Sequence, residues 1–113
     1  MNKIKMLIAI FTALFAVNSR ASANSYPTEA TAEYVMTCMA TNGQTPDALR
    51  RCSCSIDAIA SAIPYDVYER ADTILKMYAS TGQSASLFRE TPMFKTILDQ
   101  LRAAQVEADF RCF

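Results

Sequence analysis

The four cysteines are the side chains of this 113-residue chain whose chemistry and spacing are most informative. Cys38 stands in the segment MTCM, Cys52 and Cys54 stand in the segment RCSCS, and Cys112 is the last residue but one. Thiols in these positions could ligate a soft metal ion, act as a redox pair or form structural disulfides. The compartment and the helices that carry the cysteines decide among these three chemistries.

A metal site would use the sulfurs around Cys38. Met36 and Met39 flank this cysteine, and thioether and thiolate donors together suit Cu(I) or zinc. Zinc sites normally bring CxxC spacing or histidine, and the chain has no histidine. Methionine on a helix is also a common core residue. We therefore predict no metal and no cofactor, and retain a soft-metal (Cu or Zn) carrier as an alternative function.

The redox and disulfide interpretations depend on where the CSC segment lies. Redox pairs typically use CxxC at the start of a helix, whereas Cys52 and Cys54 fall in the middle of a predicted helix. An even number of cysteines in a short exported chain is typical of a disulfide framework. We therefore expect two structural disulfides.

Helix geometry favours one pairing of the four cysteines. Cys52 and Cys54 point about 200° apart on a helix, so they cannot bond to each other. Cys52 lies about 3 Å nearer than Cys54 to the level of Cys38 across the preceding turn. This favours Cys38–Cys52 with Cys54–Cys112. The swapped pairing, Cys38–Cys54 with Cys52–Cys112, remains open.

Residues 1–23 have the pattern of a secretory signal peptide. A short basic lead precedes an unbroken apolar run of 12 residues at 6–17, and Ala21 and Ala23 supply small residues for cleavage after Ala23. The run is shorter than the roughly 20 apolar residues that a membrane span needs. We expect a periplasmic or secreted protein that has no membrane contact after signal cleavage.

The mature chain, residues 24–113, is expected to form one domain. Three basic residues would leave with the leader, so eight basic and eleven acidic residues would remain, with a net charge of −3. The longest basic cluster is Arg50-Arg51. Nucleic acid is therefore not an expected partner, nor is an anionic membrane surface.

The mature chain is predicted to be all-α, a compact four-helix domain stapled by two disulfides. It holds only two glycines and is rich in helix-forming residues. The predicted helices span about 28–40, 46–63, 65–79 and 92–112, and a short turn lies at 84–89. Thr45 and Pro46 form a helix start, and Gly43 and Gly82 stand at helix ends.

Apolar residues at intervals of three and four predict the buried face of each helix. In chain order the predicted faces are Thr31, Tyr34, Val35, Cys38 and Met39; Leu49, Cys52, Ile56, Ile59 and Ile63; Val67, Ala71, Ile74 and Tyr78; and Phe94, Ile97, Leu98, Leu101, Ala104 and Ala108.

Catalysis is not predicted. The chain lacks histidine, the usual general base near neutral pH, and has too few glycines for nucleophile-elbow or phosphate-loop motifs. Its carboxylate pairs have simpler explanations. Asp66 and Glu69 suit the start of a helix, and Glu107 and Asp109 suit a solvated helix face.

A partner surface is predicted from aromatic residues, which are enriched in protein interfaces. The candidate residues are Tyr65, Tyr68, Tyr78, Phe110 and Phe113. The alternative is that several of them belong to the core of a chain that has no tryptophan.

Three segments, EYVMTCMATNGQT, RCSCSIDAIASAIPYD and LRAAQVEADFRCF, carry a resemblance to a known group. The chain looks like small exported cysteine-containing helical proteins of bacteria that oxidise alcohols with quinoprotein (PQQ-dependent) dehydrogenases and c-type cytochromes. The resemblance covers nearly all of residues 24–113 and implies a non-catalytic accessory protein with a protein partner. The chain lacks CxxCH, so it would not carry covalent haem itself. A looser likeness to periplasmic chaperones and immunity partners implies a chaperone or inhibitor-type binder instead.

Overall fold

The computed structural model describes residues 26–80 and 91–113. The predicted signal peptide 1–23, the predicted turn at 84–89 and Gly82 lie outside these residues. The described part contains four helices and no strands: α2 (Thr28–Asn42), α3 (Pro46–Ala62), α4 (Tyr65–Ser80) and α6 (Pro92–Cys112). The predicted all-α fold and the order of its helices are confirmed.

The start of α3 follows directly from its sequence. The backbone N–H of Ala48 donates to Thr45 Oγ1 at 3.1 Å, so Thr45 is the N-cap. Pro46 takes the first helical position, where its missing N–H costs nothing. Pro64 follows the last residues of α3, and α4 begins at Tyr65.

Gly43 makes the turn between α2 and α3. Its φ of 103° and ψ of 156° lie in a region that is essentially restricted to glycine. Its N–H donates to the carbonyl oxygen of Met39 at 2.9 Å, which closes the end of α2. The predicted helix end at Gly43 is confirmed.

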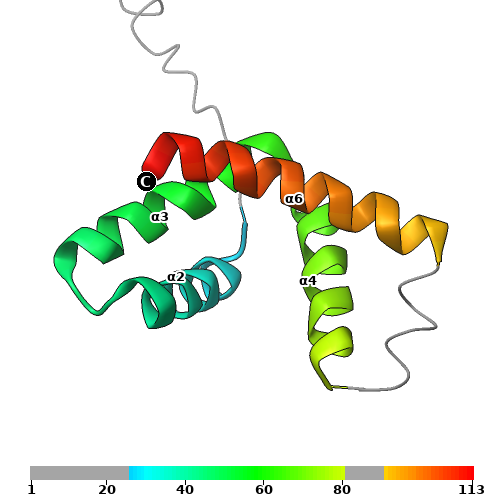
Figure 1. Cartoon of the computed structure of the whole chain (residues 1–113), viewed down its shortest axis with the longest axis horizontal. Helices are drawn as coiled ribbons and strands as arrows, with labels where there is room; N and C mark the ends of the chain where they lie inside the picture. Colours follow the sequence, from blue (N-terminus) through cyan, green and yellow to red (C-terminus); the bar gives the residue numbers. More distant parts are fainter. Residues whose placement is uncertain (1–25, 81–90) are drawn as a thin grey trace, which may run out of the picture.

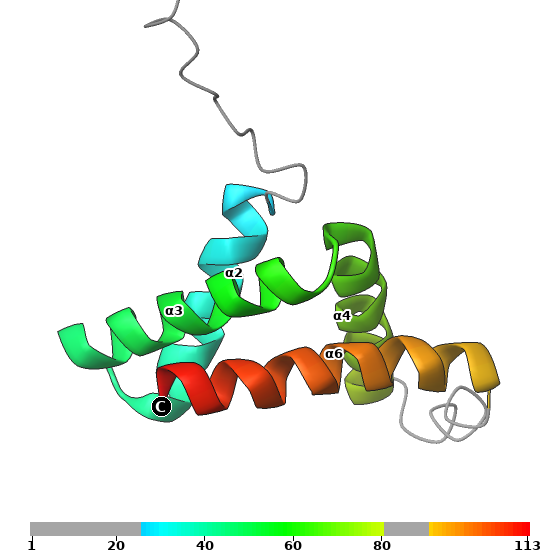
Figure 2. The same ribbon diagram turned by 90° about the horizontal axis from the view of Figure 1, so that it is seen from above.

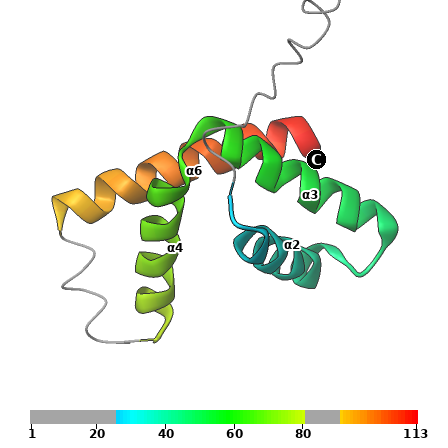
Figure 3. The ribbon, with the colours of Figure 1, turned by 180° about the vertical axis from the view of Figure 1, so that it is seen from behind.

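Helices α3 and α6 form the centre of the molecule. They run antiparallel and side by side, α2 packs on α3, and α4 packs on α6 (Figures 1 and 2). Helices α2 and α4 extend from the same side of the α3–α6 pair, as the view from behind also shows (Figure 3). Both terminal segments of the described chain therefore contact α3.

The core lies where the apolar faces of α3, α4 and α6 meet. Ile56 and Ile59 of α3 are almost completely buried, as are Ala71 of α4 and Ala108 of α6. The rest of the core comprises Ala58, Ile63, Tyr68, Ile74, Ile97, Leu98, Leu101 and Ala104, with Val67, Tyr78 and Phe94 partly buried against it. The predicted faces of these three helices are correct in most positions because helical periodicity selects them.

The structure corrects the predicted burial of the α2 face and of Leu49 in α3. No residue of α2 is fully buried, and its predicted face, including Tyr34 and Cys38, is only half-buried. This helix packs on α3 and leaves its other sides open. Leu49 is exposed because the first turn of α3 extends past the C-terminal end of α6 (Figure 1).

Candidate functional site

The two disulfides join the central helix α3 to the helices on either side of it. Cys38 bonds to Cys52, and Cys54 bonds to Cys112, with a Cα–Cα distance of 5.8 Å in each pair. Cys52 is completely buried toward α2, whereas Cys54 is half-buried toward α6. The favoured pairing is confirmed and the swapped pairing is wrong, because the two sulfurs leave α3 in different directions.

All four sulfurs are thus engaged in covalent bonds. The described part of the chain has no free cysteine, and no three of its His, Cys, Asp or Glu side chains are grouped to hold a metal ion. A thiolate ligand would become available only after reduction of a disulfide.

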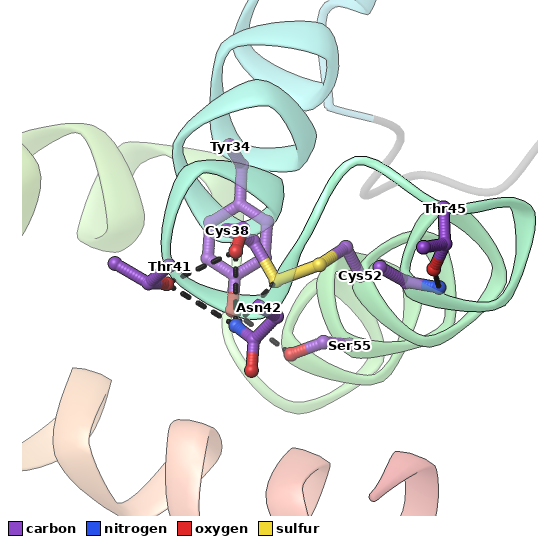
Figure 4. Close-up of a disulfide and its surroundings, with 8 residues drawn as sticks. Tyr34, Cys38, Thr41, Asn42, Thr45, Cys52 and Ser55 are labelled. Atoms are coloured by element: carbon purple, nitrogen blue, oxygen red, sulfur yellow. Dashed lines mark hydrogen bonds between the residues drawn. A yellow bond between two sulfur atoms is a disulfide. The ribbon is translucent and has the colours of Figure 1, made fainter.

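A polar contact lies beside the Cys38–Cys52 disulfide (Figure 4). The hydroxyls of Tyr34 and Ser55 are 2.8 Å apart, and Ser55 is only 1% exposed. Thr41 Oγ1 and Asn42 Nδ2 donate to the carbonyl oxygen of Cys38 at 3.0 and 2.9 Å. The last two bonds satisfy a carbonyl at the end of α2, and the Tyr34–Ser55 contact orients α2 against α3.

A cavity of about 610 Å³ opens beside this contact. Its lining combines the residues around the disulfide with the end of α6: Tyr34, Thr37, Cys38, Thr41, Asn42, Ser55, Asp109 and Phe113. The lining is hydroxyl- and amide-rich, with one carboxylate and two aromatic rings. Such a surface can hold a polar chain segment by hydrogen bonds, and its residue types provide no histidine base and no free thiol.

An exposed apolar surface adjoins this cavity at the C-terminal end of α6. Val106, Phe110 and Phe113 are spaced by four and three residues and are 54%, 89% and 51% exposed. Together with Asp109 they line a hollow of about 410 Å³. We call Val106, Phe110 and Phe113 the C-terminal apolar surface. Phe113 belongs both to this surface and to the lining of the larger cavity.

Covalent and electrostatic contacts hold the C-terminal apolar surface in place. Cys112 lies between its two phenylalanines and is bonded to Cys54 of α3. The guanidinium of Arg51 lies 6.0 Å from the centroid of the Phe113 ring, within the range of a cation–π contact.

The five aromatic residues predicted as a partner surface do not form one surface. Phe110 and Phe113 are exposed at the end of α6. Tyr68 is only 8% exposed, so its predicted place on an exposed surface is wrong. Tyr65 is half-buried beside Tyr68, and Tyr78 lies at the opposite end of α4 beside Lys95 and Leu98 of α6.

Tyr65 and Tyr68 pack instead in a cluster with Tyr26, which precedes α2. The Tyr26 ring centroid lies 5.2 Å from that of Tyr65 and 5.0 Å from that of Tyr68. Tyr26 donates a hydrogen bond to the carbonyl oxygen of Ile63 at 2.9 Å. Burial, followed by the negative charge of Asp66 and then by the neighbouring Tyr65 hydroxyl, raises the pKa of Tyr26 to about 12. The sequence contained no signal for this role, since Tyr26 lies outside the predicted helices.

None of the helices in the described ranges combines the length and the apolar composition that crossing a membrane requires. Fold and site thus define an all-α domain with two disulfides that ends in an exposed apolar surface. Comparison of the chain with protein-family models, with curated proteins and with solved structures found no match.

Proposed function

We propose that this chain is a non-catalytic, exported protein that binds another protein through the C-terminal apolar surface. The observation that supports this most strongly is the 89% exposure of Phe110 next to two further exposed apolar side chains. Contiguous apolar patches are uncommon on the surfaces of monomeric proteins and frequently mark interaction sites. Aromatic residues also contribute a large part of the binding free energy at protein interfaces.

The rigidity of the surface favours binding. The Cys54–Cys112 disulfide holds the last turn of α6 against α3, so Phe110 and Phe113 are already ordered before a partner arrives. A preorganised surface loses less conformational entropy on association than a flexible tail does. Arg51 and Asp109 beside the apolar residues provide the polar rim that interfaces typically have.

The compartment and the resemblance narrow the expected partner. Two disulfides are typical of proteins from an oxidising compartment, and together with the signal-like leader they support a periplasmic or secreted location. The resemblance to exported proteins of alcohol-oxidising bacteria suggests a quinoprotein dehydrogenase or its cytochrome as the partner. The chain would then be an accessory protein of periplasmic alcohol oxidation.

Crosslinking from the apolar surface tests this proposal. A photo-reactive phenylalanine analogue placed at position 110 should capture one abundant protein in the periplasm of the producing cell. The same analogue at Met93, which is 62% exposed at the other end of α6, is the matched control and should capture none. Phe110→Ser in an otherwise wild-type chain should reduce co-purification of the captured protein at least tenfold, with an unchanged melting temperature.

The other outcomes decide between the proposal and its alternatives. Capture of many unfolded proteins would replace it with a chaperone function, and capture of a specific toxin or enzyme whose activity falls would indicate an inhibitor-type binder. Equal capture from positions 93 and 110, or no capture from either, would contradict the proposal. Stoichiometric copper or zinc on the isolated protein would favour the soft-metal carrier.

A further inference from the structure

The turn that follows α2 contains an asparagine–glycine pair, Asn42-Gly43, a sequence that favours spontaneous deamidation. In this reaction the backbone nitrogen of the second residue must reach the side-chain carbon Cγ of the asparagine. Glycine hinders that approach least, because it has no Cβ and the greatest backbone freedom. Both residues are exposed, and beyond its chain neighbours no atom of the described residues lies within 4 Å of the place that a Cβ on Gly43 would take. Only the local hydrogen bonds can therefore protect Asn42.

Hydrogen bonds engage both reacting groups while the last turn of α2 is intact. The backbone N–H of Gly43 donates to the carbonyl oxygen of Met39 at 2.9 Å, so the attacking nitrogen keeps its proton and faces back along the helix. Asn42 Nδ2 donates to the carbonyl oxygen of Cys38 at 2.9 Å and to Thr41 Oγ1 at 3.2 Å (Figure 4). A carbonyl oxygen can only accept, so these bonds fix the orientation of the Asn42 amide. The reaction therefore requires that this turn opens.

The Cys38–Cys52 disulfide ties this turn to α3. No residue of α2 is fully buried, and segments with few buried contacts open locally at a low cost in free energy. Cys38 lies four residues before Asn42, and its sulfur is bonded to the completely buried Cys52. The carbonyl oxygen of the same Cys38 accepts the hydrogen bond from the Asn42 amide. A cross-link that holds Cys38 in place thus also holds the group that protects Asn42.

We propose that Asn42 is a site of spontaneous deamidation whose rate is set by opening of the last turn of α2, and thereby by the Cys38–Cys52 disulfide. In the open turn the Gly43 nitrogen loses its proton and attacks Cγ of Asn42. The new C–N bond closes a five-membered imide, the bond from Cγ to Nδ2 breaks, and ammonia leaves with the proton. Water then adds to either carbonyl of the imide and opens the ring to isoaspartate or aspartate. The modification site is separate from the C-terminal apolar surface and does not depend on the proposed function.

The product cannot restore the closed turn. A carboxylate has no N–H, so both hydrogen bonds from Nδ2 are lost. The new negative charge lies beside the carbonyl oxygen of Cys38 and at the C-terminal end of α2, where the helix dipole disfavours an anion. Isoaspartate also adds a carbon to the main chain at this position. Deamidation therefore loosens the α2 wall of the cavity that Asn42 lines, and it does so irreversibly.

Deamidation rates of the folded and unfolded chain test the proposal. Samples are incubated at one mildly alkaline pH, well below the melting temperature of each folded variant, and analysed by peptide mapping with isoaspartate detection. The reduced, urea-unfolded chain gives the reference rate, and the folded, oxidised protein should react at Asn42 at least tenfold more slowly. Cys38→Ser/Cys52→Ser should react at least fivefold faster than the folded wild type. The matched control Cys54→Ser/Cys112→Ser lacks the other disulfide and should stay within twofold of the wild type.

Further measurements examine the route and its consequence. An excess of isoaspartate over aspartate, and a rate that rises with pH, would identify the imide intermediate. Asn42→Asp imitates one product and should increase amide hydrogen exchange in the last turn of α2 more than Asn42→Ala, which removes the same hydrogen bonds without adding a charge. Equal deamidation rates in the two cysteine variants, or a folded wild type that reacts as fast as the unfolded chain, would overturn the proposal. Absence of deamidation in the unfolded chain, or equal exchange in the two Asn42 variants, would also overturn it.

Discussion

At the scale of single residues, Ser55 is the polar side chain most deeply placed in the core. It is 1% exposed on α3, among residues that are otherwise apolar. Its hydroxyl pairs with that of Tyr34 on α2 at 2.8 Å, beside the Cys38–Cys52 disulfide (Figure 4). The bond therefore links α2 specifically to α3, and α2 itself has no fully buried residue.

Removing the Tyr34 hydroxyl should cost more stability than removing the Ser55 hydroxyl. Tyr34→Phe leaves the buried Ser55 hydroxyl without its partner, and we expect a loss of about 1–3 kcal/mol in the free energy of unfolding. Ser55→Ala should cost less, because the half-buried Tyr34 hydroxyl can bind water instead. Adding Ser55→Ala to Tyr34→Phe should recover part of the loss. Urea unfolding of the three variants measures this, and equal costs for both single variants would contradict the asymmetry.

At the scale of elements, the two disulfides stabilise different parts of the fold. Cys38–Cys52 spans 14 residues and holds α2, whereas Cys54–Cys112 spans 58 residues and joins α3 to the end of α6. Each cross-link stabilises the fold by lowering the conformational entropy of the unfolded chain. This contributes about 3 kcal/mol for the first disulfide and about 4 kcal/mol for the second. Each value is a large share of the roughly 5–15 kcal/mol that stabilises a typical domain.

Replacing both cysteines of one disulfide should therefore affect a different part of the fold than replacing both cysteines of the other. Cys54→Ser/Cys112→Ser should lower the melting temperature of the whole domain by more than about 10 °C, because α3 and α6 share the core. Cys38→Ser/Cys52→Ser should increase amide hydrogen exchange mainly in residues 28–42, since α2 has little buried surface of its own. Circular dichroism and hydrogen-exchange mass spectrometry measure these effects. Retained protection of α2 in the second variant would show that α2 does not depend on its disulfide.

At the scale of the whole molecule, the tyrosine cluster connects the start of α2 to the junction of α3 and α4. Tyr26 contacts Tyr65 and Tyr68, and its hydroxyl bonds to Ile63 at the end of α3. Burial is the main reason that the pKa values of Tyr26 and Tyr68 are raised. The folded protein therefore resists deprotonation of these hydroxyls more than the unfolded chain does.

This difference predicts a loss of stability at alkaline pH. The pKa of Tyr26 is raised from 10.0 to about 12, so its contribution is complete below pH 10 and is lost as the pH rises toward 12. We expect the melting temperature to fall across this interval, with a Tyr26→Phe variant showing a shallower decline. Melting curves at each pH and tyrosinate absorbance measure both quantities.

The sequence by itself determined the helices and favoured the disulfide pairing that the structure has. Thr45 and Pro46 start α3 by local hydrogen-bond chemistry, and the three- and four-residue spacing of the isoleucines selects its buried face. The opposite directions of Cys52 and Cys54 follow from helix geometry alone. The helix starts, the buried faces and the directions of the two cysteines depend on residues within a few positions of one another, which is why they were predictable.

Only the tertiary structure decided which aromatic residues are exposed. Tyr68 and Phe110 are both aromatic residues on predicted helices, yet the first is buried under Tyr26 and the second is open to solvent. The same holds for the contact between α2 and α4, where Lys76 meets Glu33 from 43 residues away. Such contacts depend on how whole helices cross, and the crossing is set by the packing of all their side chains together. No local pattern in the sequence contains that information.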